Sequence, residues 1–467
     1  MIFSALIFPL LTTQAQQLAQ LEKQSVFDAR MEKMFVASGD PGAGVRVVIN
    51  GKVAYDKAFG VANEETKIPA KTSMSFEIGS LSKQFTSVSA LMLVQEGKLS
   101  LSETIGSILP QVPEAWKSAT IDQIMHHMSG IPDYEEIAAY DFYNAPRTNA
   151  EVLAQAAKKE PAFKPGERFD YSNTGYYLIG MVIEKRSGMP LSQFLRRRIF
   201  DKLGMKSTYA DPPTSTPMTG YHSRTGKRVA QPPIAWSSSL GAGAIVSTLD
   251  DFMKWDAALY TEKLLPKNLL EKIWTPTKLN DGSVNSYGYG WFDTQFRGLK
   301  ELNHSGQTNG FTCIYRRYPE KHCSVWAFTN TYDGGGVFSM ARLALSRYLT
   351  SVNYALIPIP EDPDPTRTKQ HIGLIALVAN GGDDLSALAP NMKNVATEAR
   401  FENTRKQIKG LIAVSDSYRF VRMVKITDPT VGEIQEYLYR QANPDGDKYW
   451  NLRFNMGLLT GLTVENQ

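Results

Sequence analysis

Residues 76–97 read FEIGSLSKQFTSVSALMLVQEG, and this stretch decides the fold. A short apolar run ends at Gly79 and predicts a strand, and the next residues predict a helix that stops at Gly97. The helix is apolar on most of its sides, which places it in the middle of a domain. Ser80 stands at its expected N-cap, and Lys83 follows three residues later on the same helical face.

Ser80 and Lys83 form a pair that suits nucleophilic catalysis. A serine hydroxyl becomes a strong nucleophile only when a neighbouring group takes its proton. A lysine whose charge is disfavoured by burial can take it, and the free N–H groups at a helix start can bind an oxyanion. A second interpretation stays open at this point, in which Ser80 is only a helix cap and Lys83 only a surface residue of the first turn.

Composition excludes several classes of function. The chain has 467 residues, more than one small core needs, so two domains are expected. The formal net charge is +4 and no long basic run occurs, which gives no case for nucleic-acid binding. The six histidines and two cysteines form no HExxH motif or Cys/His cluster, so we predict neither a metal site nor a cofactor.

The first residues predict export. Residues 1–11, MIFSALIFPLL, are apolar but too short to span a bilayer, and Thr13 and Ala15 are small residues of the kind a signal peptidase requires. We therefore expect a signal peptide at 1–15, a periplasmic or secreted protein, and no integral membrane span after cleavage. No basic residue precedes the apolar run, so a folded strand or helix at this position is the alternative.

Hydrophobic periodicity and turn residues outline the rest of the first domain. A hairpin is expected over 45–55, because Asn50-Gly51 is a strong turn signal. Residues 211–235 are rich in Pro, Thr and Gly and indicate a long surface excursion. Helices are expected at 17–38, 120–130, 148–159, 176–186, 190–203 and 266–274.

Two polar features stand beside these helices. The adjacent His126 and His127 close the helix 120–130, and we interpret them as a packed helix end rather than a ligand pair. Residues 169–175, FDYSNTG, predict a polar loop before an apolar helix. On an extended loop Tyr171 and Asn173 point the same way, so Tyr171 could relay a proton and Asn173 could hold an amide. A simple helix-entry turn is the alternative.

The pattern then changes to strands, at 287–292, 301–306, 311–318 and 323–330, with a closing helix at 337–349. His304-Ser305-Gly306 ends one of these strands, and Gly306 would let a substrate approach the strand edge. The N–H of Gln307 could pair with that of Ser80 as a two-donor oxyanion hole.

The last two of these strands form a predicted hairpin that contains both cysteines. If its turn centres on residues 320–321, Cys313 faces Phe328 and Cys323 faces Tyr318. The two thiols then do not meet, and no disulfide is expected.

Three motifs in order make a family resemblance. Ser80-x-x-Lys83, Tyr171-x-Asn173 and His304-Ser-Gly306 resemble the penicillin-recognising serine hydrolases over roughly residues 20–350. The similarity is greatest to the class C β-lactamase-like branch, with its DD-peptidases, D-aminopeptidases and esterases. It implies a β-lactamase/transpeptidase-like α/β (mixed α+β) fold, in which an antiparallel sheet flanked by helices carries an inserted all-helical lobe.

The resemblance also implies roles for the residues. Ser80 would be the acylated nucleophile, Lys83 and Tyr171 would share proton transfer, and the N–H groups of Ser80 and Gln307 would form the oxyanion hole. The substrate-binding residues would be Asn173, His304, Ser305 and Gly306. His304 stands where β-lactamases of this branch have lysine, and because histidine is largely neutral at pH 7, efficient β-lactam hydrolysis is not expected.

These motifs predict a cofactor-free serine hydrolase that acts through an acyl-enzyme on peptide, amide or ester substrates, of DD-peptidase, D-aminopeptidase or esterase type, with weak β-lactamase activity at most. The alternative is a catalytically silent penicillin-binding-type protein that binds cell-wall peptides or other acyl ligands. Peptidoglycan peptides are candidate partners in both cases, and the oligomeric state stays open.

The C-terminal hundred residues predict a separate unit. Residues 352–372 are rich in Pro and Asp and indicate a linker between a hydrolase domain at 16–351 and an accessory domain at 373–467. A helix over about 385–409 and strands at 410–414, 418–425, 434–441 and 449–455 predict a small α+β fold. No motif in it carries chemistry, and substrate gating, wall binding and oligomerisation remain equal possibilities.

Overall fold

The computed structural model describes residues 23–210, 218–223, 227–332, 334–349, 360–415, 417–428, 432–442 and 447–466. The expected signal peptide at 1–15 lies outside the described residues. One compact unit spans Lys23–Tyr348, and Leu349–Gln467 belong to a second. The first unit has a mixed α/β fold with an antiparallel sheet and flanking helices, as the resemblance implied.

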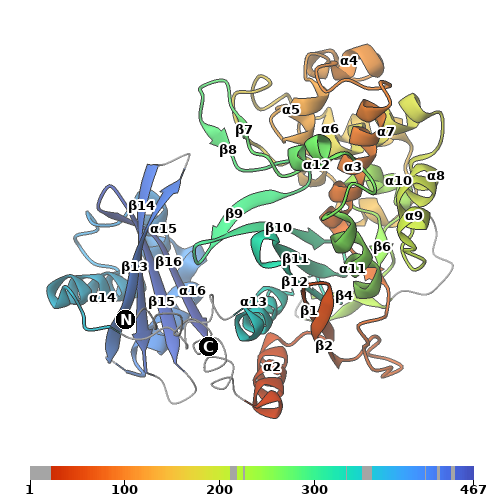
Figure 1. Ribbon diagram of the computed structural model, residues 1–467. Helices are drawn as coiled ribbons and strands as arrows, with labels where there is room; N and C mark the ends of the chain where they lie inside the picture. Colours follow the sequence, from red (N-terminus) through yellow and green to blue (C-terminus); the bar gives the residue numbers. More distant parts are fainter. Residues whose placement is uncertain are drawn as a thin grey trace, which may run out of the picture. The chain divides into compact units, whose positions relative to one another are not determined.

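A six-stranded antiparallel sheet forms the centre of the first unit (Figure 1). Its order is β2-β1-β12-β11-β10-β9, and every neighbouring pair is antiparallel. Asn50 and Gly51 have φ of 50° and 72°, as the hairpin turn between β1 and β2 requires. The strands are β1 Gly42–Ile49, β2 Lys52–Gly60, β9 Phe292–Phe296, β10 Leu299–Gln307, β11 Thr312–Tyr318 and β12 Cys323–Thr329.

Helices cover both faces of this sheet (Figure 1). The helix α13 (Gly336–Tyr348) packs on β1, β11, β12 and on α2 (Gln24–Ser38). On the other face Phe328 stacks on Phe76 at 4.2 Å between ring centroids, and a large apolar core continues into the helical region. That region contains α3 Ser82–Gln95, α4 Ile105–Ile108, α5 Ile121–Met125, α6 Asn149–Ala156, α7 Asn173–Ser187, α8 Leu191–Leu195, α9 Asp201–Leu203, α10 Trp236–Ser239, α11 Leu249–Ala258 and α12 Lys267–Lys272.

Among the described residues of the first unit, three short two-stranded ladders lie outside the six-stranded sheet. The strand predicted before Ser80 is β3, and it pairs with β6. The surface excursion 211–235 contains the hairpin β4–β5 in its described part. The ladders consist of β3 Phe76–Glu77, β4 Gly220–His222, β5 Val229–Gln231, β6 Val246–Ser247, β7 Thr277–Lys278 and β8 Val284–Asn285.

The central helix differs from the prediction at its first turn. Gly79–Leu81 form a 3₁₀ turn, and α3 begins only at Ser82. The N-cap is Leu81, which makes no side-chain capping bond, so the prediction that Ser80 caps this helix was wrong. The expected burial is confirmed, because every residue from Ser82 to Leu93 is buried.

Several other element boundaries also differ from the prediction. The helix expected over 120–130 ends at Met125, because His127 adopts a left-handed φ of 57°. Residues 287–291 form a bend with Gly290 at φ 81° instead of a strand, and β9 starts at Phe292. The β11–β12 register is as predicted, with Cys313 opposite Phe328, and both cysteines are free.

The second unit is an antiparallel meander with helices. Its strands are β13 Tyr418–Asp428, β14 Gly432–Gln441, β15 Lys448–Asn455 and β16 Leu458–Asn466, paired in that order. Its helices are α14 Pro365–Asn380, α15 Pro390–Thr397 and α16 Glu402–Ile412. Three expectations were wrong here: residues 365–372 are helical rather than linker, 410–412 end a helix rather than start a strand, and β16 was not predicted.

Candidate active site

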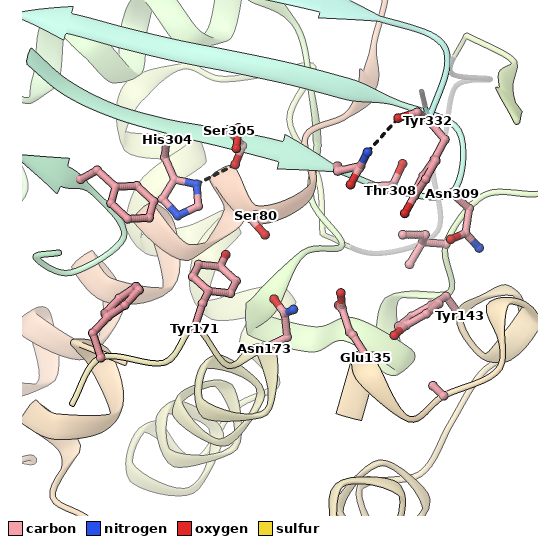
Figure 2. A pocket seen from close by; sticks show the side chains of 15 residues that line it. Ser80, Glu135, Tyr143, Tyr171, Asn173, His304, Ser305, Thr308, Asn309 and Tyr332 are labelled. Carbon is pink, nitrogen blue, oxygen red and sulfur yellow. Dashed lines mark hydrogen bonds between the residues drawn. The ribbon is translucent and has the colours of Figure 1, made fainter. Parts of the chain in front are cut away.

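A cleft of about 530 Å³ opens above the first turn of α3 (Figure 2). The strand β10 forms one wall, and the start of α7 with the residues after α5 forms the opposite one. The surface excursion 211–235 contributes Ile234 to the wall of the cleft. The lining residues are Ser80, Glu135, Ala138, Tyr143, Phe169, Tyr171, Asn173, Ile234, Phe292, His304, Ser305, Gln307, Thr308, Asn309 and Tyr332.

Two glycines bring β10 against the turn that carries Ser80. A Cβ atom at Gly79 would collide with the backbone of Gln307, and one at Gly306 would collide with the carbonyl of Ile78. Gly306 therefore serves backbone packing, and it does not line the cleft, contrary to the expected approach of substrate to this residue. The side chains of Ser305 and Gln307, on either side of it, are exposed at the cleft.

Lys83 lies beneath the cleft and is completely buried. Its Nζ lies 2.9 Å from Ser80 Oγ, which agrees with the predicted i, i+3 contact. It also donates to Asn173 Oδ1 at 2.6 Å and to the Ala242 carbonyl at 2.8 Å. Every one of these partners is an uncharged oxygen.

The surroundings of Lys83 favour its neutral form. Burial lowers its pKa to about 7, although the charges of Glu135 and Asp133 raise it in part. No carboxylate touches the amine, so burial dominates. A large fraction of the amine is therefore unprotonated near neutral pH, which is the state in which it can accept a proton.

Tyr171 stands across the cleft from Ser80, with its hydroxyl directed toward that residue (Figure 2). The hydroxyl is buried and has no hydrogen-bond partner among the described residues. Burial raises the pKa of Tyr171 well above its ordinary value, and this effect outweighs the nearby Ser80 hydroxyl, which lowers it. Tyr171 is thus a neutral phenol with Lys83 Nζ 4.8 Å from its ring centroid.

Asn173 does not lie on an extended loop, as the sequence had suggested. Ser172 caps α7 by accepting from the Gly175 N–H, and Asn173 is the first helical residue. Its amide is fixed at both ends, because Oδ1 accepts from Lys83 and Nδ2 donates to Asp133 Oδ2 at 3.0 Å. One amide hydrogen remains for a ligand in the cleft.

His304 closes the other end of the cleft as a neutral imidazole. Its Nδ1 lies 2.6 Å from the Ser305 carbonyl, which can only accept, so Nδ1 carries the proton. Nε2 is then the acceptor for the Tyr287 hydroxyl at 3.0 Å. Burial, followed by the charge of Lys83, lowers the pKa of His304 to about 3. His304 therefore supplies no positive charge, and no described residue that lines the cleft is lysine or arginine.

Sequence reasoning missed two acidic residues at this site. The 3₁₀ turn Tyr134–Glu136 begins after Asp133, and Glu135 points into the cleft beside Asn173 (Figure 2). Glu135 is open to the cleft, but the cleft walls displace much of its water, and this desolvation together with the charge of Asp133 raises its pKa above the ordinary value. The only signal in the sequence was the run of acidic residues directly after Pro132.

Residues 24–348 match the family model described as Beta-lactamase. The chain belongs to the Beta-lactamase family. The match covers the whole compact unit that contains the cleft.

Two curated relatives show the range of this family. Penicillin-binding protein 4* of Bacillus subtilis (strain 168) is 30% identical over 57% of this chain and 63% of its own length. A D-aminopeptidase of Gluconobacter oxydans (strain 621H) is 27% identical over 77% of this chain and 68% of its own length. The chain thus spans somewhat less than two thirds of the first relative.

Two solved structures resemble the fold of this chain. The octameric penicillin-binding protein homologue from Pyrococcus abyssi superposes with a TM-score of 0.63 at 21% identity, over 96% of this chain and 99% of that one. The D-amino acid amidase from Ochrobactrum anthropi SV3, complexed with D-phenylalanine, has a TM-score of 0.61 at 26% identity, over 70% of this chain and 99% of that one.

The part of the chain that the structure describes contains neither a candidate metal site nor a candidate membrane span. No group of three or more His, Cys, Asp or Glu side chains there could hold a metal ion. Among the same residues, no helix is both long and apolar enough to cross a membrane.

Proposed function

We propose that this Beta-lactamase family member is a serine hydrolase that forms an acyl-enzyme on Ser80. The observation that carries the proposal is the environment of Lys83. A neutral amine has two hydrogens and one lone pair, and the two carbonyl oxygens of Asn173 and Ala242 use both hydrogens. The lone pair is then directed to Ser80 Oγ at 2.9 Å, which is the geometry of a general base.

The reaction would proceed in two steps, acylation of Ser80 and hydrolysis of the acyl-enzyme. Lys83 takes the proton of Ser80 while Oγ attacks the substrate carbonyl carbon, and the N–H groups of Ser80 and Gln307 bind the oxyanion. Tyr171 gives its proton to the leaving amine or alcohol and recovers one from Lys83, so the C–N or C–O bond breaks and the acyl-enzyme remains. Water then attacks the ester by the reverse sequence, which releases the acid and restores Ser80.

The charges of the cleft favour a substrate with a free amino group. Glu135 and Asp133 are acidic, and neutral His304 gives a substrate carboxylate no cation to bind. An ammonium group beside Glu135 would lower the pKa of that carboxyl and hold it ionised. The rings of Tyr143, Phe169 and Phe292 offer apolar surface to a side chain. With the D-aminopeptidase and D-amino acid amidase relatives, this supports amides and esters of D-amino acids as substrates.

β-Lactams and carboxylate-terminated peptides fit this cleft less well, because each would bring an anion to a cleft whose described lining residues include no lysine or arginine. The alternative of a catalytically silent penicillin-binding-type protein keeps the same cleft, but deacylation would be absent. It differs in one measurable quantity, the turnover of the acyl-enzyme.

The remaining parts of the chain add three further proposals. We propose that the protein is exported, on the strength of its apolar first residues. We propose a hydrolase domain at 16–351 and a C-terminal accessory domain that includes the whole of α14, which the two compact units support. Peptidoglycan peptides would be candidate substrates of an exported enzyme, and the accessory domain would gate substrate, bind the wall or mediate assembly.

A labelling experiment tests the proposed function. The protein is treated with a fluorophosphonate probe, the adduct is mapped by mass spectrometry, and hydrolysis of D-phenylalanine amide, L-phenylalanine amide, a p-nitrophenyl ester and nitrocefin is measured side by side. We expect label on Ser80 and turnover that is fastest with the D-amide. Label without turnover would favour the silent binder, and equal activity of Ser80→Ala would refute both.

A further inference from the structure

His127 holds the residues on both sides of Tyr171. The Asp170 N–H donates to the His127 carbonyl at 2.8 Å, and the Ser172 N–H donates to His127 Nδ1 at 3.1 Å. His127 itself is 1% exposed and has a left-handed φ of 57°. A single residue therefore fixes the backbone immediately before and after the phenol.

The imidazole of His127 also packs on the Tyr171 ring. The ring centroids are 4.2 Å apart with an interplanar angle of 33°, and the Tyr287 ring lies 4.6 Å from the imidazole. The phenol is thus held through its backbone and through its face. No hydrogen bond among the described residues holds its hydroxyl, so the direction of the hydroxyl depends on these contacts.

The contacts of His127 allow only one neutral tautomer. A backbone N–H can only donate, so Nδ1 must be the acceptor and the proton lies on Nε2. Nε2 is buried and has no partner among the described residues. Protonation of Nδ1 would break the bond to Ser172, and burial together with the charge of Lys83 keeps the pKa of His127 well below its ordinary value.

We propose that His127 is a positioning residue for proton transfer, which keeps the Tyr171 hydroxyl in line between Ser80 and the leaving group. His127 does not line the cleft, so it acts through Tyr171 rather than on the substrate. The inference rests on the proposed acyl-enzyme mechanism. It separates the two adjacent histidines, because His126 packs on Tyr289 at 4.4 Å and directs Nδ1 toward the Asp122 carbonyl at 3.0 Å.

Two substitutions separate the hydrogen bond from the packing. His127→Phe keeps a ring on Tyr171 but leaves the Ser172 N–H without its acceptor. We expect the single-turnover acylation rate to fall about 10- to 100-fold, with KM changed less than about twofold, because a misplaced proton donor slows chemistry more than binding. His127→Asn should stay within about threefold of wild type, because Oδ1 replaces Nδ1 as acceptor and asparagine tolerates the left-handed φ.

His126→Phe is the matched control, since it also replaces a buried imidazole but leaves residues 170–172 untouched. We expect its acylation rate to equal that of the wild type. A wild-type rate in His127→Phe, an equal loss in His127→Asn, or an equal loss in His126→Phe would overturn the inference. If wild-type Ser80 takes no label, the proposed function fails instead, and that result is recognised before any variant is made.

A measurement on the unmodified protein covers the case in which His127→Phe does not fold. Histidine-selective ¹⁵N NMR, with His127→Asn used for assignment, should show one buried imidazole with its proton on Nε2 and no titration from about pH 5.5 to 8.5. A signal from His127 that titrates in this range, or that carries the proton on Nδ1, would overturn the inference without any substrate.

Discussion

Lys83 and Arg317 are both buried cations of the same unit, with 0% and 1% exposure, but their surroundings shift their pKa values in opposite directions. Arg317 Nε donates to Asp256 Oδ1 at 2.6 Å, and this carboxylate helps to raise the pKa of Arg317 although burial opposes the shift. Lys83 touches only neutral oxygens, and its pKa falls to about 7.

The difference shows that the partner of a buried basic side chain decides its role. A carboxylate partner gives a structural ion pair, and neutral partners give a base. A carboxylate in contact compensates the buried charge, so Arg317 stays protonated and serves the packing of β11. Neutral oxygens satisfy the N–H groups of Lys83 without compensating its charge, so the amine releases its proton easily. The carboxylates of Glu135 and Asp133 act on Lys83 without touching it, which keeps its pKa near neutrality instead of far below it.

Replacing Lys83, whose hydrogen-bond partners are all neutral oxygens, should have the largest effect on activity. We expect Lys83→Met to reduce the rate of Ser80 acylation by about 10³-fold or more, because general-base assistance is lost. Two buried carbonyl oxygens also lose their donor, at a cost of about 1–3 kcal/mol. Stopped-flow labelling with a fluorophosphonate measures the rate, and urea unfolding measures the stability. An unchanged rate in a folded variant would assign the base elsewhere.

Replacing Arg317, which is paired with Asp256, should have the opposite effect: a large loss of stability with little change in the acylation rate. Arg317→Met leaves Asp256 buried and uncompensated, so we expect the free energy of unfolding to fall by about 3–5 kcal/mol. The acylation rate per folded molecule should stay within about twofold of wild type. The double variant Arg317→Met/Asp256→Asn should recover part of the stability, since no lone charge remains. Loss of acylation without loss of stability would remove the distinction between the two cations.

The pH dependence of activity tests whether the charge of Glu135, which does not touch Lys83, raises the pKa of Lys83. Because Lys83 accepts a proton only when neutral, kcat/KM should rise as the pH increases through about 7. Glu135 raises the pKa of Lys83, so Glu135→Gln should move this acid limb to lower pH. The same variant should raise KM for D-phenylalanine amide about fivefold, as expected for a partly solvated ion pair.

Glu136→Gln is the matched control for this measurement, because its exposed side chain pairs with Lys159 instead of facing the cleft. Its pH profile and KM should match those of the wild type. A shift of the acid limb to higher pH in Glu135→Gln would contradict the assigned sign.

The smallest expected effect is a mild loss of stability that should leave activity unchanged, and it serves as a control for general destabilisation. Thr120 caps α5 through a capping box with Gln123, and its side chain does not line the cleft. Thr120→Ala should lower the free energy of unfolding by about 1 kcal/mol. Its acylation rate and acid limb should equal those of the wild type. A change in the acid limb would mean that general destabilisation can imitate the effects assigned to Lys83.

Local patterns were sufficient for much of the fold. The Asn50-Gly51 turn, the register that separates Cys313 from Cys323, and the i, i+3 contact of Ser80 and Lys83 each depend on residues close in sequence. The error at the start of α3 arose because a 3₁₀ turn places Ser80 before the helix instead of at its cap. The helix α14 had a visible signal, since Asp364 caps it and Pro365 follows at its first position, but the surrounding prolines favoured a linker.

The candidate site could be assembled from three motifs only in part. The structure brings Ser80, Lys83, Tyr171, Asn173, His304, Ser305 and Gln307 together at one cleft, and their catalytic roles stay predictions. The Ala242 carbonyl could not be predicted, because a backbone acceptor leaves no trace in residue type. Glu135 and the Tyr287 hydroxyl reach the site only because the fold brings distant segments together. Their positions relative to the three motifs therefore could not predict them.

Gly79 packs directly on the backbone of Gln307, and Gly306 packs directly on the carbonyl of Ile78, so no side chain separates the floor of the cleft from its β10 wall. We expect this backbone contact to tie the position of the nucleophile to that of the second oxyanion donor. Selection for a new substrate is then expected to act on the facing wall, where Tyr143 and Ile234 line the cleft. Exchange of Glu135 on the same wall would also change the pKa of Lys83.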